Sequence, residues 1–449
     1  KGLWLRVAGP LGPWPQDIAT LLAVPAFRRL WLSTCASNFV LWTEMIITSW
    51  VALQLTGSPW LVALAGVCRA APVPLIGPLS GALADRVDRM RLVRIAQWGN
   101  LTALSLLAGS MLTGHGAYWQ LLVIAIWLGM SMALEWPSRR VLLMDLAGPD
   151  HLLSAVVLDR VTQSVARVVG PLLAGALLAL WAGGAYAALV LFPALSLLAL
   201  GDLAAVHTTR QADGNTVWRQ LREGLVYVRR EPVIWAVLLL TVAMNCFVFP
   251  AKQLYAVIAE DVLRVGPVEL GWMGAANGLG APLGLLLLPR ISSDQGYRWT
   301  LVVGAMLASL ALAAFAGSTS LALALALLVL SGIGQAVFAV MQATLILGRT
   351  DPAFRGRAMG LLVLATGSTP IGALEAGAVA ERWGAPLAIG TNALLCTALV
   401  AMIALSSPQL LRDGPEGTPA PAAAGPQLRE PARQPKDSEP RDHTQTGVA

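Results

Sequence analysis

The chain has 449 residues, of which 56% are hydrophobic and only 12% are charged, about half the charged share of an average soluble domain. Apolar runs such as LLVIAIWLGMSMAL and LALALALLVL recur, each inside a stretch that approaches the roughly 20 residues needed to span a bilayer. This composition excludes a disordered chain, a disulfide scaffold and a soluble domain on a single anchor. The net charge of +6 does not indicate nucleic-acid binding, because the arginines lie between apolar runs.

Charged, Gly and Pro clusters divide the N-terminal part into a polar segment, 1–25, and a series of apolar segments. Residues 1–25 lack the pattern of a cleavable signal peptide. Six apolar segments are expected at about 28–54, 59–83, 92–113, 118–137, 155–181 and 185–206. The linker that follows, 207–232, places Trp218, Leu221, Leu225 and Val228 at helical spacing among arginines, which predicts an amphipathic surface helix.

The C-terminal part repeats this organisation. Six more apolar segments are expected at about 233–257, 269–289, 299–317, 320–347, 357–379 and 384–406. The sequence therefore predicts an all-α membrane protein with twelve transmembrane helices in two six-helix bundles, 26–206 and 233–406. Asp85 and Arg89, after the second apolar segment, have counterparts with the same spacing after the eighth, Asp294 and Arg298. A duplicated six-helix unit would produce such a repeat. The tail, 407–449, is rich in proline and poor in large apolar residues, which predicts disorder.

The positive residues predict the orientation, because Lys and Arg near membrane helices are retained on the cytoplasmic side. Both termini and the loops on their side hold 25 of the 31 Lys and Arg residues. The opposite side is expected to hold Lys252, Arg264 and Arg382, and Arg69, Arg160 and Arg167 lie within or at the mouth of a segment. Both termini are therefore expected in the cytoplasm of a multi-pass plasma (inner) membrane protein.

No catalytic motif is apparent. The sequence contains no nucleophile and base pair, no metal-ligand cluster and no phosphate-binding loop. Its four cysteines fall in apolar segments without a CxxC pair, so neither a disulfide framework nor a metal site is expected. We therefore expect no catalytic residue, no metal and no cofactor. A secondary transporter is favoured over a polytopic membrane enzyme and over a sensor or scaffold that acts through the tail.

Two charges inside apolar segments point to function, because an ionisable group at the centre of a membrane helix costs roughly 2.5 to 3.5 kcal/mol on insertion scales. Glu44 and Arg69 flank the turn near Gly57 at almost equal separations, so they lie at matching depth and can pair if they share a face. One hypothesis is that Glu44 takes and releases a proton during transport while Arg69 pairs with it in one conformation. The alternative is a fixed structural ion pair. All four histidines lie outside the apolar segments, so a carboxylate is the expected proton carrier.

Other polar residues in the apolar segments are weaker candidates. Arg167 is the best candidate to bind an anionic group of a substrate, and Glu375 is a second candidate for proton coupling. Five amides are expected either to line a cavity or to bond neighbouring helices: Asn245, Gln253, Asn277, Gln335 and Gln342. Glu135 and Asp159 are expected to form structural pairs near the cytoplasmic surface.

The loop GALADRVDRMRLV resembles the loop between helices 2 and 3 of the major facilitator superfamily, which reads roughly G-x-L-a-D-R-x-G-R-R. The matching residues are Gly81, Asp85, Arg86, Arg89 and Arg91. Asp88 and Met90 depart from the pattern, which leaves the turn geometry open. The resemblance implies that this loop gates conformational change and that Asp85 docks near the start of helix 11, where RGRAMGLL supplies Arg355, Gly356 and Arg357. A plain basic cytoplasmic loop is the alternative.

The run ARVVGPLLAG places Gly170, Pro171 and Gly175 within two turns of the fifth segment. Small residues allow helices to approach closely, and a proline frees one backbone bond so that the helix can bend. The run is similar to a helix 5 motif of superfamily antiporters, G-x-x-x-G-P-x-x-G-G, although Ala166 and Ala174 replace two glycines. An ordinary packing kink is the alternative.

The segments LREGLVYVRREP, ARVVGP and FRGRAMGL are similar to the enterobactin-exporter-like branch of the superfamily, also described as transmembrane secretion effectors and related to macrolide efflux pumps. The resemblance implies a proton-coupled exporter of drug, macrolide or siderophore type that works by alternating access. An importer or a lipid or solute carrier is the alternative within transport. The expected partners are a small molecule, protons and the lipid bilayer, with no nucleic acid, and a monomer is expected.

Overall fold

The computed structural model describes residues 14–76, 88–201, 203, 217–291, 296–352 and 354–407. All the described residues belong to one compact unit. Every regular element in the described ranges is helical, which agrees with the predicted all-α class. Gly81, Asp85, Arg86 and Asp294 lie outside these ranges, as does the predicted tail after residue 407.

The helices before the linker begin and end where proline, glycine and small polar residues permit. Helix α2 ends at Gly57, whose φ of 62° is left-handed, and the Ser58 side chain accepts a hydrogen bond from the Leu61 amide at the start of α3. Proline occupies the first turn of both helices. In chain order the elements are α1 (Trp14–Ala23), α2 (Pro25–Thr56), α3 (Pro59–Ala70), α5 (Arg89–Leu112), α6 (Tyr118–Ala147), η1 (Pro149–His151), α7 (Leu152–Leu180) and α8 (Ala182–Leu200).

The helices from the linker onward include two interrupted ones. The described elements are α9 (Val217–Arg230), α10 (Pro232–Phe247), η2 (Phe249–Leu254), α11 (Tyr255–Val257), η3 (Ile258–Val262), α12 (Pro267–Ile291), α13 (Tyr297–Ala316), α14 (Leu321–Arg349), α15 (Arg355–Thr366), α16 (Thr369–Trp383) and α17 (Ala385–Ser406). The predicted segments 233–257 and 357–379 are each broken, at Val248 and at Gly367. Pro250 and Pro370 lie just beyond these breaks and lack the amide hydrogen that a continuous helix would use.

Eleven helical stretches in the described ranges are long and apolar enough to cross a membrane. The predicted segment 92–113 corresponds to α5, which has 24 residues and is not among the eleven. Gln97 and Asn100 lower its apolar content, and both side chains are buried against neighbouring helices. Its length is sufficient for a span.

Helix α6 continues to Ala147, well beyond the end predicted at residue 137. Arg139 therefore lies inside a helix, only 2% exposed, rather than in the cytoplasmic loop to which the charge count assigned it. Lys252 is a second correction. It lies half-buried within the span Pro232–Val262, not in an external loop.

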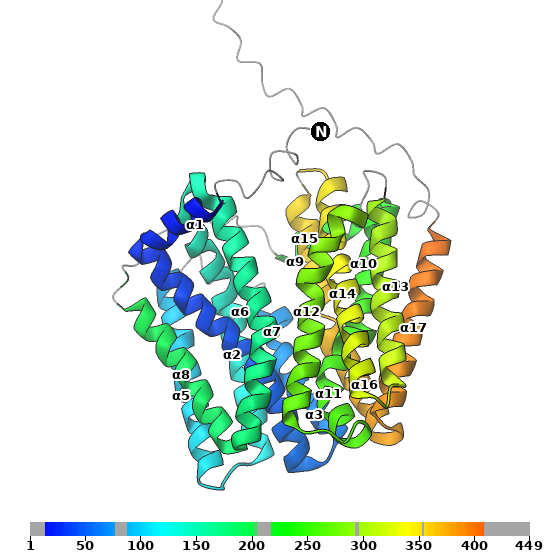
Figure 1. Cartoon of the computed structure of the whole chain (residues 1–449). Helices are drawn as coiled ribbons and strands as arrows, with labels where there is room; N and C mark the ends of the chain where they lie inside the picture. Colours follow the sequence, from blue (N-terminus) through cyan, green and yellow to red (C-terminus); the bar gives the residue numbers. More distant parts are fainter. Residues whose placement is uncertain are drawn as a thin grey trace, which may run out of the picture. The chain divides into compact units, whose positions relative to one another are not determined.

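The helices pack in two groups (Figure 1). Before the linker, α2 packs on α7 and α8, and α5 packs on α6 and α8. After it, α14 packs on α12 and α13, and α17 packs on α13, α16 and α10. The main contacts between the groups are α7 with α12 and α3 with α16. We call the end of the helices that carries the Gly57 and Gly384 turns the Gly57 end, and the opposite end, where α5 begins, the Asp88 end.

Glycines bring α7 and α12 close together in the half nearer the Gly57 end. A Cβ atom added at Gly271 would lie 2.6 Å from the carbonyl oxygen of Pro171, and one at Gly278 would lie 2.5 Å from that of Arg167. Side chains other than hydrogen cannot fit at such distances, so these glycines set the spacing of the two helices. The contact joins the two helix groups directly.

Replacing Gly271 with Ala is expected to destabilise the protein, by about 1 to 3 kcal/mol, because the added methyl group overpacks the α7 and α12 contact. The matched control is Gly109→Ala in α5, where an added Cβ meets nothing within 4 Å. That control should leave stability unchanged or raise it slightly, since Ala favours a helix over Gly. Thermal unfolding of the purified protein measures both. Equal effects of the two substitutions would contradict the assigned role of Gly271.

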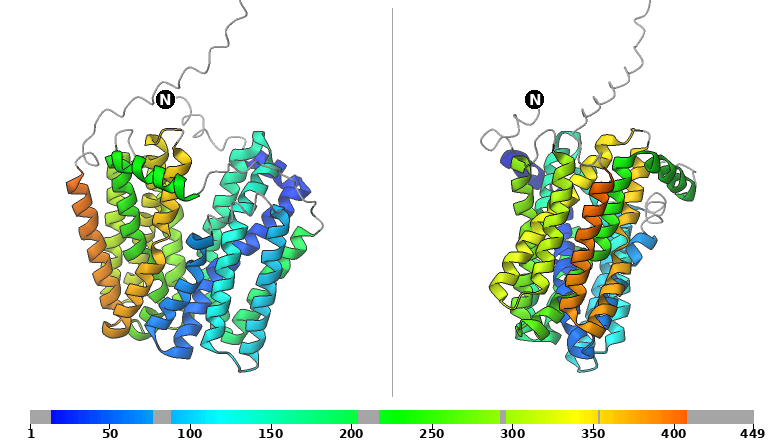
Figure 2. Two further views of the ribbon diagram at one scale, coloured as in Figure 1. Left: turned by 180° about the vertical axis from the view of Figure 1, so that it is seen from behind. Right: turned by 90° about the vertical axis from the view of Figure 1, so that its right-hand side faces the viewer.

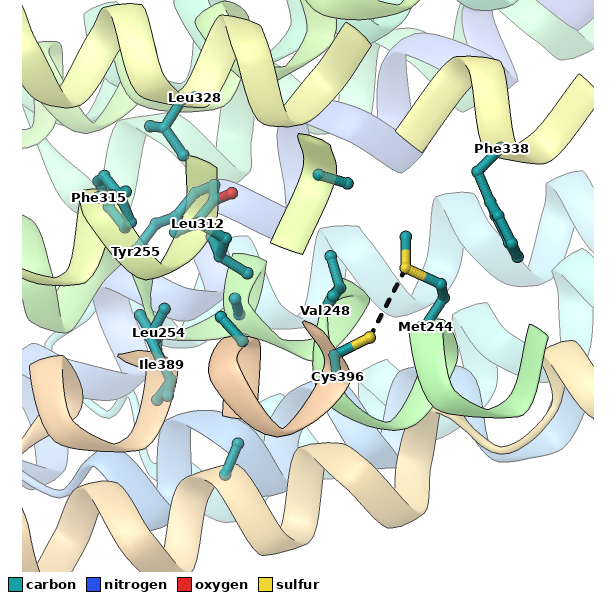
Figure 3. Packing of buried hydrophobic residues seen from close by; sticks show 14 of the residues in the cluster. Met244, Val248, Leu254, Tyr255, Leu312, Phe315, Leu328, Phe338, Ile389 and Cys396 are labelled. Carbon is teal, nitrogen blue, oxygen red and sulfur yellow. Dashed lines mark hydrogen bonds between the residues drawn. The ribbon is translucent and has the colours of Figure 1, made fainter. Parts of the chain in front are cut away.

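The core of the second group is apolar and closely packed. The rings of Tyr255 and Phe315 meet edge to face with centroids 5.6 Å apart, and the Cys396 thiol contacts the Met244 sulfur at 3.8 Å (Figure 3). These side chains come from α10, α11, α13 and α17. The core therefore fixes the interrupted helix, of which α10 and α11 are parts, against α13 and α17.

The linker helix α9 lies across one end of the second group (Figure 2), where it contacts α10 and α15. The Tyr227 and Phe354 rings stack with centroids 4.5 Å apart, and Arg357 lies 3.2 Å from a Glu223 carboxylate oxygen. Val228 is fully buried. The linker thus contains the predicted helix, and one face of that helix is docked on the protein.

Candidate functional site

Glu44 and Arg69 form an ion pair between α2 and α3. The Arg69 Nε lies 3.1 Å from Glu44 Oε2, and the two side chains are 14% and 3% exposed. Neither atom has a hydrogen-bond partner of suitable direction, so the contact is electrostatic. The other Glu44 oxygen accepts a hydrogen bond from Thr48 at 2.7 Å, and the Thr48 hydroxyl also lies 3.0 Å from that of Tyr186. Glu44 is thus held by a hydrogen bond at Oε1, whereas its contact with Arg69 at Oε2 is electrostatic only.

A small polar cavity adjoins this pair. It has a volume of about 50 Å³, room for a few water molecules. Arg69, Asn100, Ser131 and Glu135 are among its lining residues. The Asn100 Oδ1 and the Ser131 Oγ are buried and lack a hydrogen-bond partner, and buried polar atoms are seldom left without one. The cavity is therefore suited to hold water between Arg69 and Glu135.

Glu135 lies in a second buried ion pair, with Arg139 one helical turn later on α6. Gln97 donates to Glu135 Oε2 at 2.7 Å, and Ser37 donates to Oε1 at 2.9 Å. Arg139 also donates to Ser33 at 2.8 Å and to Ser196 at 3.2 Å. This network joins α2, α5, α6 and α8. The pairing expected for Glu135 is present, but it lies deep in the helix group rather than at a surface. The spacing of four residues between Glu135 and Arg139 is the sequence feature that indicates this pair.

Arg167 lies where α7 meets the second helix group. Its guanidinium carbon is 4.9 Å from the centroid of the Trp42 ring, and it interacts electrostatically with Tyr255 and Lys252. The Lys252 Nζ is 5.4 Å from the Phe249 ring centroid. Sequence reasoning singled out Arg167 but missed Lys252 and Tyr255; the signal for an interrupted helix at this point was Pro250 inside an apolar run.

The five candidate amides divide into bonded and unbonded ones. Asn245 accepts a hydrogen bond from Thr369 at 3.0 Å, and Gln342 accepts one from Thr241 at 2.9 Å, so both bond neighbouring helices. One side-chain atom lacks a partner in each of Gln253, Asn277 and Gln335. Glu375, on α16, accepts a hydrogen bond from Asn392 of α17 at 2.7 Å. Among the described residues, no ion pair or hydrogen bond joins Glu375 to Arg69, the partner of Glu44.

The described half of the loop motif begins α5. Asp88, which departs from the superfamily pattern, caps the helix: its Oδ1 accepts hydrogen bonds from the Met90 and Arg91 amides at 2.8 and 3.1 Å. Arg89 lies 4.0 Å from Asp145 of α6. Helix α15 begins at Arg355, where Arg355, Gly356 and Arg357 form its first turn. The expected docking of Asp85 there falls outside the described residues.

The glycines of the helix 5 run pack in two directions. Gly170 faces Trp42 and Thr43 of α2, and Gly175 faces Gly271 of α12. Helix α7 remains continuous through Pro171. These contacts give the run a packing role at the junction of the two helix groups. Among the described residues, no group of three or more His, Cys, Asp or Glu side chains is placed to hold a metal ion.

Comparison with known families and proteins agrees with this arrangement. The family model described as transmembrane secretion effector matches residues 18–423. The chain is 26% identical over 414 residues to the uncharacterized MFS-type transporter YfiS of Bacillus subtilis (strain 168), covering 88% of this chain and 93% of that one. It is 23% identical over 352 residues to the enterobactin exporter EntS of Shigella boydii serotype 4 (strain Sb227), covering 78% and 83%.

Solved transporter structures share the fold. A bacterial homologue of the human lysosomal transporter Spinster superposes with a TM-score of 0.65 at 16% identity, over 90% of this chain and 99% of that one. The nucleoside transporter NupG gives 0.67 at 14% identity, over 87% and 100%. At these identities the likeness concerns the fold alone. Together with the match over residues 18–423, it shows that the chain belongs to the transmembrane secretion effector family, so it is a multi-pass membrane transporter of the major facilitator type and not an enzyme.

Proposed function

We propose that the protein is a proton-coupled exporter of small organic molecules that works by alternating access between two six-helix halves. The observation that carries the proposal is the Glu44 and Arg69 pair, an ionisable pair buried among membrane-spanning helices. Buried charges in such helices are costly and usually serve transport or coupling. The exporter direction rests on the family and on relatives such as the enterobactin exporter. Siderophores, macrolides and drugs are the substrate types to test.

The surroundings of Glu44 support proton coupling. One of its oxygens is free of hydrogen bonds and faces Arg69, so protonation of the carboxylate would remove the charge that holds the pair together. The cavity that Arg69 helps to line has room for water. With Glu44 charged, the ion pair would hold α2 against α3, and with Glu44 protonated the two helices would be free to separate. Protonation would thus shift the equilibrium between two conformations. Glu375, with Asn392 as its partner, remains the second candidate for the carrier.

Contacts at the Gly57 end support alternating access. Glu381 of α16 accepts hydrogen bonds from Ser58 Oγ at 2.7 Å and from the Trp60 amide at 3.1 Å. Gln54 of α2 donates to Glu260 at 2.8 Å. These exposed contacts join the two halves beside the glycine contact of α7 and α12. Few polar bonds need to break for this end to open, as a rocking mechanism requires.

Three further features belong to the proposal. Helix α5 acts as a twelfth span, which gives six spans in each half. The excess of positive residues on the loops of the Asp88 end supports a cytoplasmic position for that end and for both termini. The protein then resides in the plasma membrane and functions as a monomer, with substrate entering from the cytoplasm through the Asp88 end.

The test is expression in a bacterial strain that lacks its own efflux pumps, followed by accumulation assays with siderophores, macrolides and dyes. We expect cells that express the protein to accumulate less of at least one compound than cells that lack it. Accumulation should return to the level of the cells that lack it when a protonophore collapses the proton gradient. The controls are the same strain without the protein and cells that express Gly109→Ala, where the added Cβ meets nothing within 4 Å, each with membrane insertion verified. Higher accumulation in the expressing cells would indicate import. Unchanged accumulation of every compound by the inserted protein would contradict the exporter proposal.

A further inference from the structure

Two cationic side chains meet where the two helix groups join. Arg167 comes from α7 of the first group, where it packs on Trp42 of α2 and on Gly278 of α12. Lys252 comes from η2 of the second group, and η2 leads into α11, which contacts both α2 and α12. The topology thus brings the two cations to the same junction, where their charges interact. Like charges repel, and the repulsion is strong in surroundings of low dielectric constant. The pair therefore opposes approach of the two groups unless an anion lies near it.

No acidic residue in the described ranges offsets these charges. The ion pairs of the described residues involve neither Arg167 nor Lys252. Both cations instead face aromatic rings, Trp42 and Phe249. A cation held by a ring alone in a membrane-spanning region is poorly compensated. Arg69 and Arg139, by contrast, each have a glutamate.

Hydrogen-bond donors around the pair are also unused. The Arg167 Nε and the Tyr255 hydroxyl are buried without a partner, as is the Asn277 Nδ2 on α12. Tyr255 and Asn277 are 2% and 4% exposed, so water does not freely satisfy them. Tyr255 interacts electrostatically with Arg167. Asn277 precedes Gly278, which packs against Arg167. The unused donors of Arg167 and Tyr255 match the needs of an oxyanion.

The backbone at Lys252 is irregular in the way that transporter sites are. Helix α10 ends at Phe247, η2 is a 3-10 turn, and a π-helical turn follows at Ile258–Val262. Short 3-10 and π segments are frequent at functional sites, and interrupted helices near the midplane supply substrate sites in many transporters. Here the interruption places Lys252 at the junction with the opposite group, to which Arg167 belongs.

We propose that Arg167 and Lys252 bind the anionic group of an organic anion, a carboxylate or sulfonate on an apolar ring system, as the transported substrate. This inference rests on the proposed transport function and adds the substrate class. The anion offsets the repulsion between the two cations, so binding favours approach of the two halves around it. Trp42 and Phe249 contact the apolar body of the substrate.

The test uses four probes with one ring system: 1-naphthoate and 1-naphthalenesulfonate as anions, 1-naphthamide as the neutral form, and 1-naphthylmethylammonium as the cation. Binding to the full chain in nanodiscs is followed by titration and by ligand-dependent thermal stabilisation. We expect the anions to bind about tenfold or more tightly than the other two, because charge-assisted hydrogen bonds are the stronger kind. Arg167→Gln and Lys252→Gln should each weaken anion binding by a similar factor.

The matched control is Arg382→Gln, an exposed cation near the Gly57 end, which should leave binding unchanged. The apo variants Arg167→Gln and Lys252→Gln should be at least as thermally stable as the wild type, since each removes one of two repelling charges; a merely structural role would lower stability. Equal binding of the four probes, or anion binding unaffected by both substitutions, would overturn the proposal.

Transport assays separate this inference from the exporter proposal. Export of a neutral or cationic compound that is indifferent to Arg167→Gln would overturn the anion site and leave the exporter intact. Binding of naphthoate through Arg167 and Lys252 without transport of any probe in proteoliposomes would support the site and count against the exporter.

Discussion

Replacing Glu44 with Gln is expected to abolish transport driven by a pH gradient while leaving substrate binding and downhill exchange in place. Glutamine imitates protonated glutamate and keeps the bond to Thr48, but it cannot release a proton. Arg69 then has no charge to pair with in any state. The gradient-driven component should therefore fall to the level that is measured without a gradient. Uptake into inverted proteoliposomes with and without an imposed gradient measures it.

Two control variants sharpen this prediction. Asp150→Asn removes an exposed carboxylate in η1 and should leave coupling unchanged. Glu375→Gln tests the second candidate carrier, which has an amide partner rather than a cation. Full coupling in Glu44→Gln would make the pair with Arg69 a structural feature only. Loss of coupling in Glu375→Gln but not in Glu44→Gln would identify Glu375, on α16, as the proton carrier.

Replacing Glu135 with Leu is expected to destabilise the protein by about 3 to 5 kcal/mol, because the buried Arg139 loses its only carboxylate partner in the described structure. Gln97 and Ser37 also lose their acceptor. The double variant Glu135→Leu, Arg139→Leu should recover much of the loss, since replacing a whole buried ion pair with apolar residues is often neutral. Thermal unfolding of the two single variants and the double variant gives the coupling energy.

The outcome of this cycle separates two roles for the network. A large coupling energy with transport retained in the double variant would make the network a structural tie among α2, α5, α6 and α8. Small and additive effects would contradict the account of a tightly coupled buried pair. Loss of transport in a stable double variant would add Glu135 to the groups that take part in coupling.

Much of the fold was predictable because membrane helices have a strong length and composition signal. The positions of nearly all spans, the linker helix and the turn near Gly57 follow from apolar runs and their breaks. The ends of segments were less predictable. Glu135 and Arg139, four residues apart, neutralise each other inside the helix group. Helix α6 therefore continues beyond the charged residues at which the sequence predicts its end.

The site was predictable to the extent that depth along a helix can be counted. Equal distances from Gly57 placed Glu44 and Arg69 at one level, and they are paired in the structure. Which face a side chain presents depends on packing between helices that are distant in sequence. That is why Lys252 is counted with the side opposite the termini, although the structure places it well inside the span Pro232–Val262. For the same reason the sequence does not predict the polar cavity between the two ion pairs.

The measurement that tests the central claim most directly is proton movement during transport. Proteoliposomes that contain the wild-type protein and a trapped pH indicator are given a compound that the cell assay shows to be exported, with no gradient imposed. The account predicts that protons leave the vesicle as the substrate enters, so that the internal pH rises. This rise should be absent in Glu44→Gln. Substrate entry without any pH change in the wild type, or an equal change in the variant, would contradict it.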